Sequence, residues 1–230
     1  MEPYITLLSD DDYSTEGDCV KSAIMFAVYR SCGKAAKVVF PSLFLNVNML
    51  QYVLERSAEL KSLIANTNSY YANELKCIPK QIYKLKDLES LSLNDTCYVK
   101  EILTEIRTHC KKFVSLSLRG VIKTEVALAI VTFVPNIKHL VLSFCRREDL
   151  MLILSGCKEL ELLDVRGCTG FDAEISTMAS RIKTFMSEGS YVEEEEEFYW
   201  DDFTDPELYD GYISGLILKE ILISPLLILP

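Results

Sequence analysis

Residues 157–168 read CKELELLDVRGC, and this stretch decides the fold of the 230-residue chain. Leu160, Leu163 and Val165 follow the pattern apolar-x-x-Leu-x-apolar. Successive side chains of a β-strand point to opposite faces, so Leu163 and Val165 would share one face and the residues between them the other. One short strand cannot bury its own apolar side. The pattern therefore predicts that similar strands stack beside it.

The same pattern recurs along the chain at a nearly constant spacing. Clear copies begin at Leu60, Leu88, Phe113, Ile137 and Leu160, and weaker ones begin at Ala35 and Ile182. Successive starts are 22 to 28 residues apart, which is the period of leucine-rich repeats. We therefore predict an α/β fold: a leucine-rich-repeat solenoid (horseshoe) of about six to seven strand–helix repeats, with a parallel sheet on the concave face. The alternative is an unrelated α/β protein with leucine-rich strands.

Helical patterns separate the predicted strands. Apolar residues three and four apart predict helices over Asn48–Arg56, Val99–His109, Thr124–Phe133 and Asp149–Ser155. Asn48, Thr124 and Asp149 are candidate N-caps, and Pro135 would end the third helix. Eight residues after the start of each clear copy, where the chain would turn off the strand, stand Asn68, Thr96, Val121, Cys145 and Cys168. Leucine-rich repeats typically have Asn or Cys there.

Composition excludes several classes of protein. Apolar residues make up 49% of the chain, too many for a mainly disordered protein. The net charge of -10 argues against a nucleic-acid partner, which needs a basic face. Much of that charge lies in Asp10–Asp12 and Glu193–Glu197. The first residues show no signal peptide, so we expect a cytoplasmic and/or nuclear location with reduced thiols.

The sequence contains no recognisable catalytic or metal-binding motif. The eight cysteines include no Cys-x-x-Cys pair, so we predict buried thiols and no metal site. The two histidines, His109 and His139, are far apart in the chain. No glycine-rich phosphate loop or hydrolase motif is present. We predict a protein that is not an enzyme and has no cofactor. The alternative, an enzyme, would require a pocket with clustered titratable groups.

Two segments point to a family. Residues 157–168 and the copy at 110–120, CKKFVSLSLRG, resemble the cysteine-containing leucine-rich repeat of F-box proteins. Residues 27–33, 50–57, 127–130 and 135–140 are similar to plant F-box/leucine-rich-repeat proteins in particular, and the resemblance covers roughly residues 18–210. It implies repeats that hold a protein to be ubiquitinated, and an N-terminal F-box that binds a Skp-type adaptor and, through it, a cullin.

The start of the chain departs from that family plan. The residues before Asp18 are acidic and lack a helical apolar period, so we expect no F-box here. The resemblance then predicts a protein-binding module like the substrate-recognition half of an SCF-type ubiquitin ligase receptor. Adaptor and cullin would bind only if an F-box equivalent is present, and membrane binding is not expected. The alternative is an F-box-less repeat scaffold or decoy with no ligase role.

The outward strand positions and the residues just after the strands are the candidate site. Serines can donate and accept hydrogen bonds, apolar residues in a solvent-facing position can mark a contact, and arginines can recognise acidic groups. The predicted partner-binding residues are Ser62, Ile64, Ser90, Ser92, Asn94, Ser115, Ser117, Arg119, His139, Val141, Leu162, Asp164 and Arg166. The alternative is that these residues only tolerate solvent.

We expect four segments along the chain. They are an acidic, disordered N-terminus (1–17), a capping helix (18–34), the repeats (35–190), and an acidic aromatic tail with an apolar end (191–230). The tail would be solvated and disordered, or an arm that docks its aromatic residues on a partner or on the concave face. Lys219, Glu220 and Pro225 argue against a membrane span near the end. The two ends together suggest an incomplete or alternatively spliced product, which transcript sequencing would test.

Overall fold

The computed structural model describes residues 4–6, 16–40, 46–65 and 75–188, all of which belong to one unit. The turn residue Asn68 and the acidic clusters Asp10–Asp12 and Glu193–Glu197 lie outside the described residues, as does the whole predicted tail. The expectations about these segments stay predictions.

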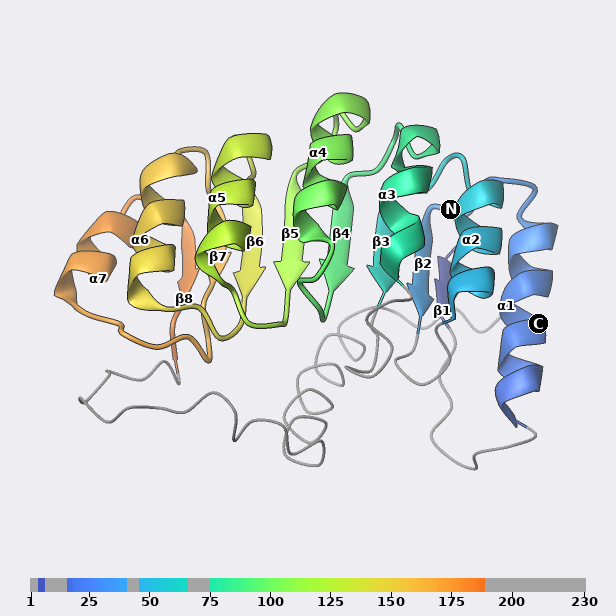
Figure 1. Cartoon of the computed structure of the whole chain (residues 1–230), viewed down its shortest axis with the longest axis horizontal. Coiled ribbons are helices and arrows are strands. Elements are labelled where there is room, and N and C mark those ends of the chain that lie inside the picture. Colours follow the sequence, from blue (N-terminus) through green and yellow to red (C-terminus); the bar gives the residue numbers. More distant parts are fainter. Residues whose placement is uncertain (1–3, 7–15, 41–45, 66–74, 189–230) are drawn as a thin grey trace. The chain divides into compact units, whose positions relative to one another are not determined.

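Within the described ranges, eight strands form one sheet whose order follows the chain from β1 to β8. Each strand pairs in parallel with the next one, as Figure 1 shows. The strands are β1 (Tyr4–Thr6), β2 (Lys37–Phe40), β3 (Ser62–Ala65), β4 (Ser90–Leu93), β5 (Ser115–Leu118), β6 (His139–Leu142), β7 (Leu162–Asp164) and β8 (Thr184–Met186).

A helix follows each strand from β2 to β7 and brings the chain back to the start of the next strand (Figure 1). The helices are α1 (Glu16–Arg30), α2 (Val47–Arg56), α3 (Ile78–Gln81) with the 3-10 helix η2 (Ile82–Lys84), α4 (Val99–His109), α5 (Thr124–Phe133), α6 (Arg147–Gly156) and α7 (Ala173–Ala179). Successive helices contact one another and cover one face of the sheet. This strand–helix repeat confirms the predicted leucine-rich-repeat fold.

The strands from β2 to β8 each begin two residues after a predicted start, the weak copies at Ala35 and Ile182 included. Two details at the N-terminus differ from the expectation. Tyr4–Thr6 forms β1, where no element was predicted, and it pairs with β2. The first helix begins at Glu16 rather than at Asp18.

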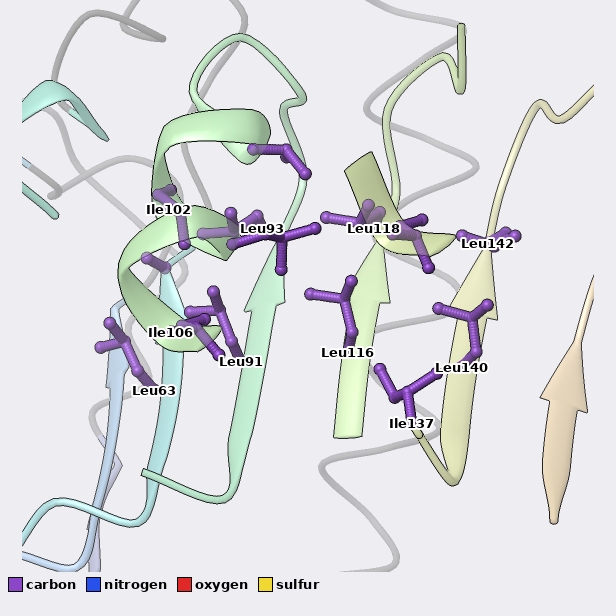
Figure 2. Close-up of a cluster of buried hydrophobic side chains, with 14 of the residues drawn as sticks. Leu63, Leu91, Leu93, Ile102, Ile106, Leu116, Leu118, Ile137, Leu140 and Leu142 are labelled. Atoms are coloured by element: carbon purple, nitrogen blue, oxygen red, sulfur yellow. The ribbon is translucent and has the colours of Figure 1, made fainter. Parts of the chain in front are cut away.

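The apolar core lies between the sheet and the helices. Leu63, Leu91, Leu116 and Leu140 lie in register on neighbouring strands, and all are buried. Figure 2 shows this row of leucines with Leu93, Leu118 and Leu142 in a second row, and Ile102 and Ile106 of α4 directed toward them. Burying one such side chain stabilises the fold by about 1.5–3 kcal/mol, so the stack supplies the core that no single repeat has.

The helix bounds match well, but the predicted caps are wrong. The N-cap of α2 is Asn46, whose side chain accepts a hydrogen bond of 2.9 Å from the Met49 backbone N–H. Thr124 is the first residue of α5 rather than its cap. Asp149 is buried inside the first turn of α6. Pro135 does follow the end of α5, as predicted.

The predicted turn positions and cysteines need two corrections. Ile122, not Val121, pairs with Cys145, because the β5 repeat has one more residue between strand and turn. Val121 is 39% exposed and Ile122 is buried. Cys77, Cys110, Cys145, Cys157 and Cys168 are buried as predicted, but Cys32 and Cys97 are exposed.

Candidate functional site

The face of the sheet opposite the helices carries the outward side chains of the strands. The pairing of β2 to β8 arranges them in two rows across the sheet. The first row is Lys37, Ser62, Ser90, Ser115, His139, Leu162 and Thr184, and the second row is Val39, Ile64, Ser92, Ser117, Val141, Asp164 and Met186. We call these two rows the open face. Neighbours in a row are about 4.8 Å apart, the spacing of strands in a sheet.

All the strand residues predicted for the site therefore lie together. Most are half-buried, as expected for side chains that stand beside one another on a sheet, while His139 is exposed. Sequence reasoning missed Lys37, Val39, Thr184 and Met186, which complete the rows at both ends. The weak copies of the repeat pattern at Ala35 and Ile182 could have identified them. In every copy the two outward residues come two and four positions after the first residue of the pattern.

The residues after the strands behave differently from the expectation. Asn94 and Arg119 are only 8% and 6% exposed, so they offer little surface to a partner. Asp164 and Arg166 are joined to each other: Arg166 Nε donates to Asp164 Oδ1 at 2.9 Å, and its Nη2 donates to Oδ2 at 2.6 Å. This two-bond pairing holds both charges in a fixed geometry. Asp164 is also 6% exposed.

Charged residues gather at the edge of the sheet where the strands begin. Glu161 lies between Lys138 and Lys183, with Nζ to carboxylate oxygen distances of 3.0 and 2.8 Å. Hydrogen bonds from Lys183 and then Lys138 lower the pKa of Glu161 to about 2. Lys112 and Asp87 form a similar pair at 2.7 Å between two other repeats. These ion pairs join successive repeats.

The described residues contain no group of three His, Cys, Asp or Glu side chains that could hold a metal ion. A hydrogen bond with Cys168 and then burial raise the pKa of the Cys145 thiol, so that thiol stays protonated and is a poor nucleophile. His109 contacts Glu105 at 3.5 Å, on α4 and away from the open face. What the arrangement offers is a contact surface.

Comparison with known proteins agrees with the fold. No family model matches the sequence. The chain is 30% identical over 168 residues to an F-box/LRR-repeat protein of Arabidopsis thaliana, and the match covers 72% of this chain. The chain is a leucine-rich-repeat protein that resembles plant F-box/LRR proteins. The match spans 52% of that relative, so this leucine-rich-repeat chain corresponds to about half of its length.

Two solved structures are also similar to the leucine-rich-repeat chain. One is the C-terminal domain of tropomodulin from Caenorhabditis elegans, with 10% identity and a TM-score of 0.47, covering 60% of this chain and 92% of that domain. The other is an internalin from Listeria monocytogenes, with 11% identity and a TM-score of 0.28, covering 70% of each chain. Among the described residues, no helix has both the length and the apolar character needed to span a bilayer.

Proposed function

We propose that this chain is a protein-binding module that holds a partner protein against its open face. The supporting observation is the pair of in-register rows that the helices leave uncovered. Ile64, Val141 and Leu162 are half-exposed on this face, and apolar side chains in such a position can mark a contact surface. Repeat proteins generally bind through the extended surface that their stacked repeats create. The proposed role is in binding and not in catalysis.

The resemblance supports a finer proposal about the partners. The bound protein would be a substrate of an SCF-type ubiquitin ligase, and the chain would work with a Skp-type adaptor and a cullin. The alternative is a repeat scaffold or decoy that binds the same proteins without a ligase. For either role we propose a reducing, cytoplasmic or nuclear location, in which cysteines remain thiols.

A tagged pull-down of the full chain from plant extract, read by mass spectrometry, tests this function. Stoichiometric recovery of a Skp-type adaptor and a cullin is the result expected of a ligase receptor. Recovery of other proteins without them would contradict the ligase role and favour the scaffold or decoy. In both cases the proteins bound to the open face must be lost when the exposed His139 on that face is changed to Glu, and kept when Ser155 on the outer surface of α6 is changed to Glu. An adaptor and a cullin held outside the open face should be kept in both variants.

A further inference from the structure

The open face is almost free of charge, although the chain carries a net charge of -10. Lys37 and Asp164 are the only acidic or basic residues at the outward positions of the described strands β2 to β8. Asp164 is neutralised by Arg166 through two hydrogen bonds. The middle of the face, from β3 to β6, therefore presents only hydroxyl, aliphatic and imidazole groups.

Some of the charged side chains near the open face are paired with or buried among other residues of the protein. At the edge where the strands begin, Glu161 is bound by Lys138 and Lys183. At the opposite edge, Arg119 is 6% exposed. A charged group of a partner placed over the middle of the face, from β3 to β6, would lose its water without gaining a counter-charge from an outward strand residue, which costs free energy. A face of this kind complements a partner surface that has no charge.

Apart from Met186 on β8, the apolar residues on the open face form two separate groups. Val39 and Ile64 lie on β2 and β3, and Val141 and Leu162 lie on β6 and β7. Serines of β4 and β5 separate the two groups. Ile64 and Val141 stand in the same row, three strands apart, which corresponds to about 14 Å. A partner that contacts both groups needs apolar side chains at that distance.

The serines between the two groups favour an extended partner. The hydroxyls of Ser90, Ser92 and Ser115 can donate and accept hydrogen bonds, whereas the hydroxyl oxygen of Ser117 is buried. An extended segment has backbone N–H and C=O groups that need partners, whereas a helix has already paired its own. Residues four apart in an extended segment lie about 13 Å from each other and point to the same side. Such a segment would contact Ile64 and Val141 with two side chains and the serines with the backbone between them.

We propose that the open face binds an uncharged, extended segment of a partner protein, with apolar side chains four residues apart that contact the Ile64 and Val141 groups. The proposal rests on the proposed binding function of this face. It adds the chemical class of the partner and the position of its two anchoring side chains.

Displayed peptides of equal length are the probe that tests this proposal. One library contains no Asp, Glu, Lys or Arg, and the other is enriched in them; both are selected on the full chain. We expect binders from the uncharged library, with apolar residues four apart. Their Kd should change less than about 3-fold between about 50 and 500 mM NaCl, because screening acts on charges. Ile64→Glu and Val141→Glu should each weaken binding more than about 10-fold, as expected when an unpaired charge is buried.

Controls separate this proposal from the function on which it rests. Ser176→Glu, at an exposed position on α7, must leave binding unchanged, and circular dichroism must show that every variant is folded. If a glutamate variant unfolds, Ile64→Ser or Val141→Ser replaces it. Suppose that the selected peptides require charged residues and lose binding in high salt, but still depend on Ile64. That result would contradict an uncharged partner and would still support the open face as the binding surface. If the selected peptides bind both open-face variants as well as the wild type, or if no peptide binds, then the uncharged partner and the binding function of the open face are both contradicted.

Discussion

At the scale of single residues, the direction of a side chain decides its role. Leu163 and Leu162 are neighbours in β7, but Leu163 is fully buried between sheet and helices while Leu162 stands on the open face. Leu163 should therefore contribute to stability and Leu162 to binding.

Replacing Leu163 by Ala should destabilise the fold by about 2–5 kcal/mol, because a cavity remains in the packed core. Urea denaturation followed by circular dichroism measures this change. Leu162→Ala is the matched control and should cost much less. Equal losses for the two variants would contradict the assignment of the two faces.

Gly156, the last residue of α6, has no room for a side chain. A Cβ atom there would lie 2.2 Å from Cγ1 and 2.7 Å from Cγ2 of Val131 on α5, so Gly lets the two helices approach. We expect Gly156→Ala to cost about 1–3 kcal/mol through overpacking. Adding Val131→Ala should recover part of that loss in a thermal or urea unfolding series. Strictly additive effects of the two substitutions would show that the contact does not limit stability.

At the scale of elements, contacts between successive repeats matter as much as the pattern within one repeat. Asn46 begins α2 by accepting the Met49 N–H, and Glu161 joins the starts of β6, β7 and β8 through two lysines. Each interaction is local in space and gives a prediction of its own.

Asn46→Ala should destabilise the protein by about 0.5–2 kcal/mol, the usual effect of removing an N-cap side chain. Asn48→Ala, two residues further along at an exposed position of the same helix, should have little effect. Chemical denaturation of the two variants shows which of the two asparagines caps the helix. A larger loss for Asn48→Ala would favour the cap expected from the sequence.

The Glu161 ion pairs should make stability depend on acid pH. The pKa of Glu161 is lowered from 4.5 to about 2 in the folded protein by Lys183 and Lys138. Its contribution is therefore fully present above pH 4.5 and is lost as the pH falls from 4.5 toward 2. We expect the unfolding midpoint of Glu161→Gln to decrease less than that of the wild type as the pH is lowered over that range. The control Glu125→Gln, on the exposed surface of α5, should follow the wild type.

At the scale of the whole molecule, folding and binding use opposite faces of one sheet. His139→Glu, at the exposed position of the open face, should therefore leave the free energy of unfolding within about 0.5 kcal/mol of the wild type, as surface substitutions generally do. It should remove the partner proteins that the wild type holds on its open face. Denaturation and pull-down of the same preparation measure both properties. A variant that unfolds, or one that still binds, would contradict the separation of the two faces.

The repeat pattern in the sequence determined the strands β2 to β8, their order and the outward residues of the open face from β3 to β7. The physical reason is that an apolar residue at a fixed position in every repeat can be buried only if equivalent residues stack. The position of each strand follows from that requirement, even for the weak copies at Ala35 and Ile182.

Only the tertiary structure decided the details that depend on distances between repeats. It showed that Ile122 rather than Val121 pairs with Cys145, that Asp164 neutralises Arg166, and that Arg119 is withdrawn from solvent. A one-residue difference in a turn, or the reach of a long side chain, changes these contacts without changing the apolar period. The sequence by itself therefore determined which face is open, and the packing of neighbouring repeats decided how little charge that face presents.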